Sequence, residues 1–90
     1  MEIFYKKSYE KMYRKLPLVI KNKVDERILW FRDNPFHELL LNHTLTGEYE
    51  GYRSINITGD YRVIFAELSL WHYEFVEFVE VGTHSQLYWE

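Results

Sequence analysis

The hydrophobic pattern changes period at about residue 50, and this change constrains the fold more than any other feature of the sequence. Before it, apolar residues recur every three or four positions, as they do on one face of an α-helix. After it, apolar and polar residues alternate, which is typical of half-buried strands. Helices therefore precede a run of strands, and this order predicts an α+β fold.

The N-terminal part predicts one short strand followed by two helices. The apolar run 3–5 indicates the strand, and Ser8 is expected to cap the first helix with its hydroxyl. Pro17 should end that helix and begin the second, which Asn34 before Pro35 should end. The expected buried stripes are Tyr9, Met12, Tyr13 and Leu16 on the first helix, and Ile20, Val24, Ile28 and Phe31 on the second.

The C-terminal part predicts three strands and a last helical turn. The strands are expected at 52–57, 61–68 and 71–81, with a tight turn at 58–60. Gly82 should break the third strand, and Thr83 with Gln86 has the spacing of a capping box. The order β-α-α-β-β-β predicts a mostly antiparallel sheet with the helical hairpin on one face. The other face would be free to hold a binding groove.

Composition narrows the kinds of protein that fit. Ninety residues are expected to form one domain, 1–90, because a shorter piece could not bury its own core. The absence of cysteine excludes disulfides, zinc-thiolate sites and thiol nucleophiles. Neither a secretion signal nor an apolar run of membrane-spanning length is present, so a cytosolic protein is expected.

Charge is divided unevenly along the chain. Residues 1–33 hold nine Lys and Arg against five Asp and Glu, a net charge of +4, while residues 34–90 carry −7. A local positive field attracts phosphate whatever the total charge is, so Lys7 and Lys11 on the first helix are candidate RNA contacts. The alternative is that these lysines only solvate a helix surface.

The motifs of several enzyme classes are missing. The four histidines form no His-x-x-x-His pair, and there is neither a phosphate-binding glycine loop nor a nucleophile elbow. What remains is a set of polar residues at strand ends and turns. Its members are His43, Asp60, Arg62, His84 and Tyr88. Each of them also has a purely structural explanation as a turn, surface or packing residue.

Three blocks of sequence carry a family resemblance. They are residues 43–47, residues 51–65 with the Gly-Asp-Tyr-Arg hairpin, and residues 81–88 with the Gly-Thr-His-x-x-Leu-Tyr ending. Together they resemble toxins of the RelE superfamily, RelE/StbE or YafQ-like, from type II toxin–antitoxin modules. The hairpin is similar to that of ParE-like gyrase inhibitors as well, whereas the ending looks more like the nucleases. The resemblance implies a RelE-like fold over the whole chain.

The resemblance also implies a reaction. A 2′-hydroxyl of mRNA would attack the adjacent phosphate without any metal or other cofactor, leaving a 2′,3′-cyclic phosphate and a 5′-hydroxyl. His84 would be the general acid or base and Arg62 would stabilise the transition state. Asp60 and His43 would assist, and Tyr88 would contact the reacting nucleotide.

Further contacts and partners follow from the same resemblance. Tyr61 could stack on a base, and Arg53, Lys7 and Lys11 are the remaining RNA-binding candidates. The implied partners are a cognate antitoxin, with which a heterotetramer or larger complex would form, and the ribosome with its mRNA, so that the chain would inhibit translation.

Two positions depart from the YafQ-like pattern. Asn56 stands where those enzymes have a histidine, and Glu80 stands where they have an arginine. Asparagine does not titrate near neutral pH, and a carboxylate repels phosphate. The alternatives to the nuclease are therefore a ParE-like gyrase inhibitor and a RelE-fold interaction protein without nuclease activity.

Overall fold

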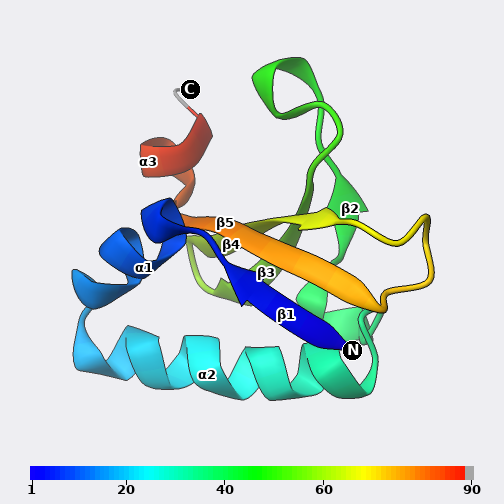
Figure 1. Cartoon of the computed structure of the whole chain (residues 1–90). Coiled ribbons are helices and arrows are strands. Elements are labelled where there is room, and N and C mark those ends of the chain that lie inside the picture. The colour runs from blue at the N-terminus through cyan, green and yellow to red at the C-terminus, as the bar shows by residue number, and fades with distance from the viewer. Residues whose placement is uncertain (89–90) are drawn as a thin grey trace.

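The computed structural model describes residues 1–88, and of Tyr88 only the backbone. It has the predicted α+β architecture, with a strand and two helices followed by strands and a short last helix (Figure 1). The elements are β1 (Glu2–Tyr5), α1 (Lys7–Arg14), α2 (Leu18–Asp33), β2 (His43–Thr44), β3 (Arg53–Thr58), β4 (Tyr61–Glu67), β5 (Phe75–Thr83) and α3 (His84–Tyr88), with 3-10 turns at Glu38–Leu40 and Gly47–Tyr49.

The five strands form one sheet in the order β1-β5-β4-β3-β2. β1 pairs with β5 in parallel, and every other pair is antiparallel, as a mostly antiparallel sheet was expected to be. α1 and α2 cover one face, whereas α3 and the loop that contains Gly47–Tyr49 rise on the other side (Figure 1). We call this second side the open face.

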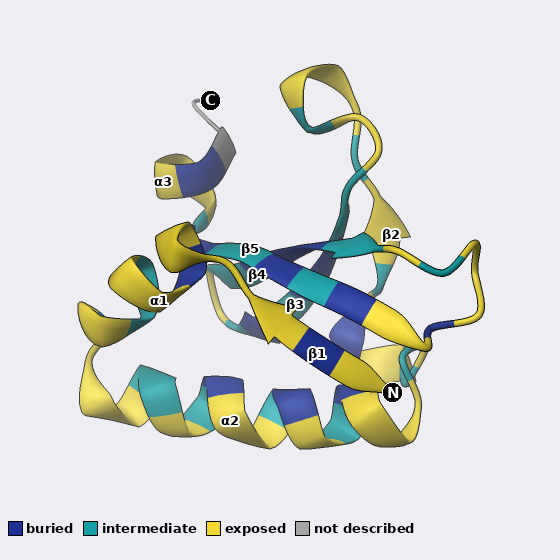
Figure 2. Cartoon of the chain, in the orientation of Figure 1, coloured by how far each residue is buried: buried dark blue, intermediate teal, exposed yellow. Residues whose placement is uncertain are grey.

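The core lies between the sheet and the helical hairpin. Ile55, Val63 and Val81 form one row across β3, β4 and β5, and each is almost completely buried. The Phe31 ring of α2 meets the rings of Phe65 and Phe78 at 5.0 and 5.7 Å. Each fully buried side chain of this size contributes roughly 1.5–3 kcal/mol, so this layer holds α2 on the sheet (Figure 2).

The ends of α2 agree with the sequence, whereas α1 ends at Arg14, before Leu16 and Pro17, and does not have Ser8 as its cap. Pro17 lies at the N-cap of α2, and Asn34, in an extended conformation before Pro35, ends that helix as predicted. The prediction that Ser8 caps α1 was wrong, because the N-cap is Lys6 and Ser8 lies inside the helix. The Ser8 hydroxyl instead donates to the Val79 carbonyl at 2.6 Å, which ties α1 to β5.

The third predicted strand was wrong at both ends. β5 begins at Phe75 rather than at Trp71, because a looped segment with left-handed residues comes first. It also continues through Gly82, which was expected to break it. Gly82 is buried, and a Cβ at this position would lie 2.7 Å from Gln86 Oε1. The glycine therefore permits a close approach of Gln86 and does not end the strand.

Candidate functional site

The turn between β3 and β4 meets the start of α3. The backbone N–H of His84 donates to the carbonyl of Asp60 at 3.0 Å. In the sheet, Arg62 lies directly opposite Gly82, two residues before His84. Asp60 and His84 are exposed and Arg62 is half-buried. Three of the predicted site residues are thus brought to one corner of the molecule.

A capping box fixes the first turn of α3. Gln86 Oε1 accepts from the Thr83 N–H at 2.8 Å, and Thr83 Oγ1 accepts from the Gln86 N–H at 3.3 Å. This is the reciprocal pair that the sequence predicted. Since His84 follows Thr83 directly, the same two bonds fix its backbone position beside the Asp60 turn.

The Arg62 side chain is held over its own hairpin. Its Nη1 donates to the carbonyls of Gly59 at 3.0 Å and Tyr61 at 3.2 Å. A guanidinium has five N–H groups, so other donors remain for a ligand. No carboxylate within residues 1–88 forms an ion pair with Arg62. The cation is positioned without being neutralised.

Asn56 lies next to Arg62 on the open face, because the two residues are paired between β3 and β4. Its Oδ1 is buried and has no hydrogen-bond partner among the residues that the structure describes. A buried acceptor without a donor is costly and uncommon in folded proteins. In the sequence, Asn56 stands out only as a departure from the family pattern, and its neighbours along the chain do not indicate a buried acceptor without a donor.

His43 lies on the same face but farther across the sheet. It belongs to the two-residue strand β2 and pairs with Ser54, whereas a loop position was expected. β2 lies two strand spacings, about 10 Å, from β4. His43 is level with Ile64, two residues along β4 from Arg62, so roughly 12 Å separates His43 from Arg62. The Nδ1 atom lies 2.7 Å from the Leu41 carbonyl. Because a carbonyl can only accept, Nδ1 carries a proton there and Nε2 of the neutral ring is an acceptor.

Tyr49 closes part of the open face. Its hydroxyl lies 2.7 Å from Glu80 Oε1 and 2.8 Å from the Leu87 carbonyl, so it links β5, α3 and the loop that contains Gly47–Tyr49. Ile64, opposite Glu80 in the sheet, and Leu87 are fully buried on this side. Glu80 thus has a structural partner. The sequence could not indicate it, because Tyr49 lies 31 residues away.

Other predicted residues lie elsewhere. Tyr61 precedes Arg62, so its side chain points to the opposite face, where it packs against the main core. Arg53 lies at the far end of β3, where its Nε donates to Asn42 Oδ1. Lys7 and Lys11 are exposed on α1. Tyr88 ends α3, and its side chain lies outside the described residues.

Neither a metal-binding cluster nor a membrane-spanning helix is present in the part of the chain that the structure describes. No group of three His, Asp or Glu side chains in residues 1–88 is arranged to hold a metal ion. None of the helices in this range is long and apolar enough to cross a membrane.

Comparison with known proteins decides the family. Residues 1–89 match the model of a family described as "Bacterial toxin of type II toxin-antitoxin system, YafQ". The chain belongs to the YafQ family. The resemblance to RelE superfamily toxins is thereby confirmed. No curated protein matches the chain.

Solved structures share the fold at low sequence identity. YafQ from E. coli strain BL21(DE3) has a TM-score of 0.79 and 21% identity, with 97% of each chain covered. The YoeB/ParE toxin from Agrobacterium tumefaciens has a TM-score of 0.75 and 21% identity, covering 93% of this chain and 99% of that one. The E. coli DinJ-YafQ toxin-antitoxin complex has a TM-score of 0.71 and 22% identity, covering 97% of this chain and 96% of that one. At these identities the likeness shows the RelE-like fold alone.

Proposed function

We propose that this YafQ-family toxin is a metal-independent endoribonuclease that cleaves mRNA on the ribosome and so inhibits translation. The observation that carries the proposal is the His84 N–H bond to the Asp60 carbonyl. This bond joins a histidine to the turn next to Arg62, whose guanidinium still has N–H groups that are not hydrogen-bonded within the described residues. A titratable ring beside an unneutralised cation is what phosphoryl transfer from RNA to its own 2′-oxygen requires.

The reaction balances with these groups alone. A base removes the 2′-hydroxyl proton, the 2′-oxygen bonds to phosphorus, and the bond from phosphorus to the 5′-oxygen breaks. An acid returns a proton to that 5′-oxygen, which leaves a 2′,3′-cyclic phosphate and a 5′-hydroxyl. In the proposal His84 transfers one of these protons, and Arg62 stabilises the charge on the phosphorane oxygens.

Three residues have supporting roles in the proposal. His43 has an acceptor at Nε2 for the second proton transfer, on the face that also holds Arg62. The Asp60 carboxylate, exposed in the β3–β4 turn, orients the His84 ring. Tyr88, at the end of the helix that His84 begins, contacts the reacting nucleotide.

Asn56 belongs to the same proposal. It lies beside Arg62 on the open face, and its buried Oδ1 lacks a donor, which a ribose hydroxyl supplies once the amide turns outward on binding. We infer that Asn56 orients the ribose by a hydrogen bond where related enzymes use a histidine. The position would then contribute to substrate placement without transferring a proton.

The RNA-binding residues have unequal support. Lys7 and Lys11 are exposed on α1, and we propose that they contact backbone phosphates. Stacking by Tyr61 and RNA contact by Arg53 stay predictions, since both side chains lie away from the open face.

A protein partner is part of the proposal. The family's description names a toxin–antitoxin system, and E. coli YafQ has been solved with DinJ. We propose that a cognate antitoxin binds this chain in a heterotetramer or larger complex and keeps it inactive in the cytosol.

Expression of single variants tests the proposal. Wild type should arrest growth and cut messages, whereas His84→Ala and Arg62→Ala should do neither. His72→Ala, which changes an exposed histidine in the β4–β5 loop, is the matched control and should behave as wild type. Growth arrest that persists in both site variants would refute the mechanism. DNA breaks in place of cut messages would indicate a gyrase inhibitor, and no arrest by wild type would indicate an interaction protein.

A further inference from the structure

Large apolar side chains are exposed at the end of the sheet where β4 finishes. They come from the segment after α2 and from the β4–β5 loop. We call them the distal patch: Phe36, Leu68, Leu70 and Trp71, which surround Arg53. Leu70 is 83% and Trp71 70% exposed. A contiguous apolar surface of this kind on a small protein indicates an interaction site.

The distal patch is separate from the proposed RNA site. Arg62 lies near the start of β4 and Glu67 at its end. Five residues at about 3.3 Å each put roughly 17 Å between the two ends. An occupant of the distal patch therefore need not touch the Asp60 turn or His84.

The β4–β5 loop adopts a strained conformation. Leu70, Trp71 and Tyr73 have φ values of 52°, 77° and 55°, in the left-handed region that favours glycine. Each such residue costs about 1 kcal/mol or more. Tyr73 turns its side chain into the core, but Leu70 and Trp71 project into solvent. The strained backbone therefore places two apolar side chains in solvent, outside the core.

Glu67 holds the loop in this shape. Its carboxylate accepts from the backbone N–H groups of Trp71 at 2.7 Å and Tyr73 at 2.8 Å, and from the N–H and hydroxyl of Ser69. Burial alone raises the pKa of the Glu67 carboxyl, but these hydrogen bonds outweigh it and hold the pKa below its ordinary value. The exposed conformation is therefore built into the fold.

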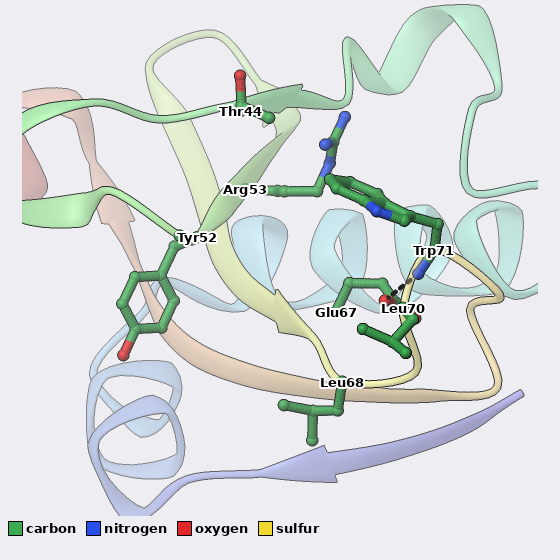
Figure 3. Close-up of a pocket in the computed structure, with 8 residues that line it drawn as sticks. Thr44, Tyr52, Arg53, Glu67, Leu68, Leu70 and Trp71 are labelled. Atoms are coloured by element: carbon green, nitrogen blue, oxygen red, sulfur yellow. Dashed lines mark hydrogen bonds between the residues drawn. The ribbon is translucent and has the colours of Figure 1, made fainter.

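Arg53 is the cation of the distal patch. It lines a cavity of about 270 Å³ together with Leu68, Leu70 and Trp71. Its Cζ lies 5.5 Å from the centre of the Trp71 ring and 5.6 Å from that of Phe36. Figure 3 shows the guanidinium beside the Trp71 indole.

The guanidinium is immobilised and still has donors. Its Nε is bound to Asn42 Oδ1 at 2.8 Å. Its terminal nitrogens make neither a hydrogen bond nor an ion pair with any residue from 1 to 88. A planar fork fixed in this way is suited to a carboxylate, which it can bind through two parallel hydrogen bonds.

The surroundings favour a protein over RNA as the occupant. Arg53 is the one cation among the residues that line the cavity, whereas a surface that binds RNA presents several Lys and Arg to successive phosphates. Leu68 and Leu70 give the cavity aliphatic walls, which suit a large apolar side chain. The one cation and the leucines together match a peptide that is both apolar and acidic.

We propose that the distal patch docks a protein segment in which a large apolar side chain stands next to a carboxylate. The apolar side chain enters the cavity between Leu68, Leu70 and Trp71, and the carboxylate pairs with Arg53. This surface goes beyond the nuclease proposal and does not depend on it.

A titration of the full chain, labelled with ¹⁵N and followed by NMR, tests the docking proposal. The probes are the peptide acetyl-Glu-Leu-Phe-Glu-amide and its matched control acetyl-Gln-Leu-Phe-Gln-amide. The acidic peptide should shift the resonances of the Trp71 indole N–H and the Arg53 Nε–H, and these shifts should reach a plateau as the peptide concentration rises. The glutamine peptide should bind at least about tenfold more weakly, which corresponds to about 1.4 kcal/mol.

Variants separate the two halves of the docking site. Arg53→Gln should remove the preference for the acidic peptide, whereas Leu70→Ser, at a side chain outside the core, should weaken both peptides. Arg32→Gln, an exposed arginine on α2, is the control and should change neither affinity. Equal affinity for the two peptides, shifts confined to other residues, or no shifts at all would overturn the proposal. Shifts at the distal patch with oligouridylate instead of the peptides would also overturn it.

Discussion

The backbone N–H of His84 lies 3.0 Å from the carbonyl oxygen of Asp60 and joins the start of α3 to the β3–β4 turn. β5 ends at Thr83 and α3 begins at the next residue, so no linker separates them. The position of His84 therefore depends on the hydrogen bonds of a single helical turn. Damage to that turn should affect cleavage even when no side chain that touches RNA is changed.

The capping box provides the first test. Gln86→Ala removes the acceptor of the Thr83 N–H and should cost about 1 kcal/mol of unfolding free energy. It should also reduce cleavage several-fold. Gln86→Glu keeps an acceptor and should stay close to wild type in both respects. Thermal unfolding and RNA cleavage measure the two effects, and an alanine variant equal to wild type in both would contradict this role of α3.

Gly82 should be coupled to Gln86. In Gly82→Ala the new Cβ would meet Gln86 Oε1 at 2.7 Å, so the amide must move and the Thr83 bond weakens. We expect a loss of about 1 kcal/mol. Gln86→Ala removes both the clash and the bond, so the double variant should lose clearly less than the sum of the single losses. Strictly additive losses in denaturant unfolding would show that the two residues are independent.

Tyr49 should hold α3 and the loop that contains Gly47–Tyr49 in place over the open face. Tyr49→Phe removes the hydroxyl shared by Glu80 and the Leu87 carbonyl, and should cost about 1–2 kcal/mol. Amide hydrogen exchange should rise in α3 and in residues 45–51, and stay unchanged in α2. Tyr52→Phe, at the neighbouring half-buried tyrosine, is the control. Unchanged exchange in α3 would mean that this bridge does not hold the helix.

Glu67 should make stability depend on pH. Its pKa is lowered in the folded chain, so its contribution is present above the ordinary glutamate pKa of about 4.3 and is lost as the pH falls through the folded value. At pH 7, Glu67→Gln should cost about 1 kcal/mol, because a neutral amide accepts more weakly than a carboxylate. The difference from wild type should narrow below about pH 4. A constant difference from pH 7 to pH 3 would contradict this account.

The sequence correctly predicted the features that depend on contacts between residues close together in the chain. The Pro17 and Asn34 helix ends, the buried stripe of α2 and the Thr83–Gln86 capping box all follow from contacts within a few residues, and all are present. β2 was missed because two residues are too few to show an alternating pattern.

The features that the sequence predicted wrongly or did not indicate depend on contacts between residues far apart in the chain or across a loop. The start of β5 was wrong because the Glu67 carboxylate binds the backbone N–H groups of the following loop and turns it away from the sheet. Ser8 finds its acceptor on β5, at Val79, instead of at its own helix end. Within the candidate site, the pairing of β3 with β4 places Asn56 beside Arg62, and no spacing in the sequence indicates that its Oδ1 is buried without a partner among the described residues.

Cleavage of a ribosome-bound message that carries a single 2′-deoxy nucleotide is the sharpest test of the proposed reaction. Wild type should cut the all-ribose message at one position and leave a 2′,3′-cyclic phosphate. The same message with 2′-deoxyribose on the 5′ side of that position should stay intact there. His84→Ala should lower cleavage of the all-ribose message by at least about a hundredfold. Undiminished cutting of the deoxy-substituted message, or full activity of His84→Ala, would contradict the account.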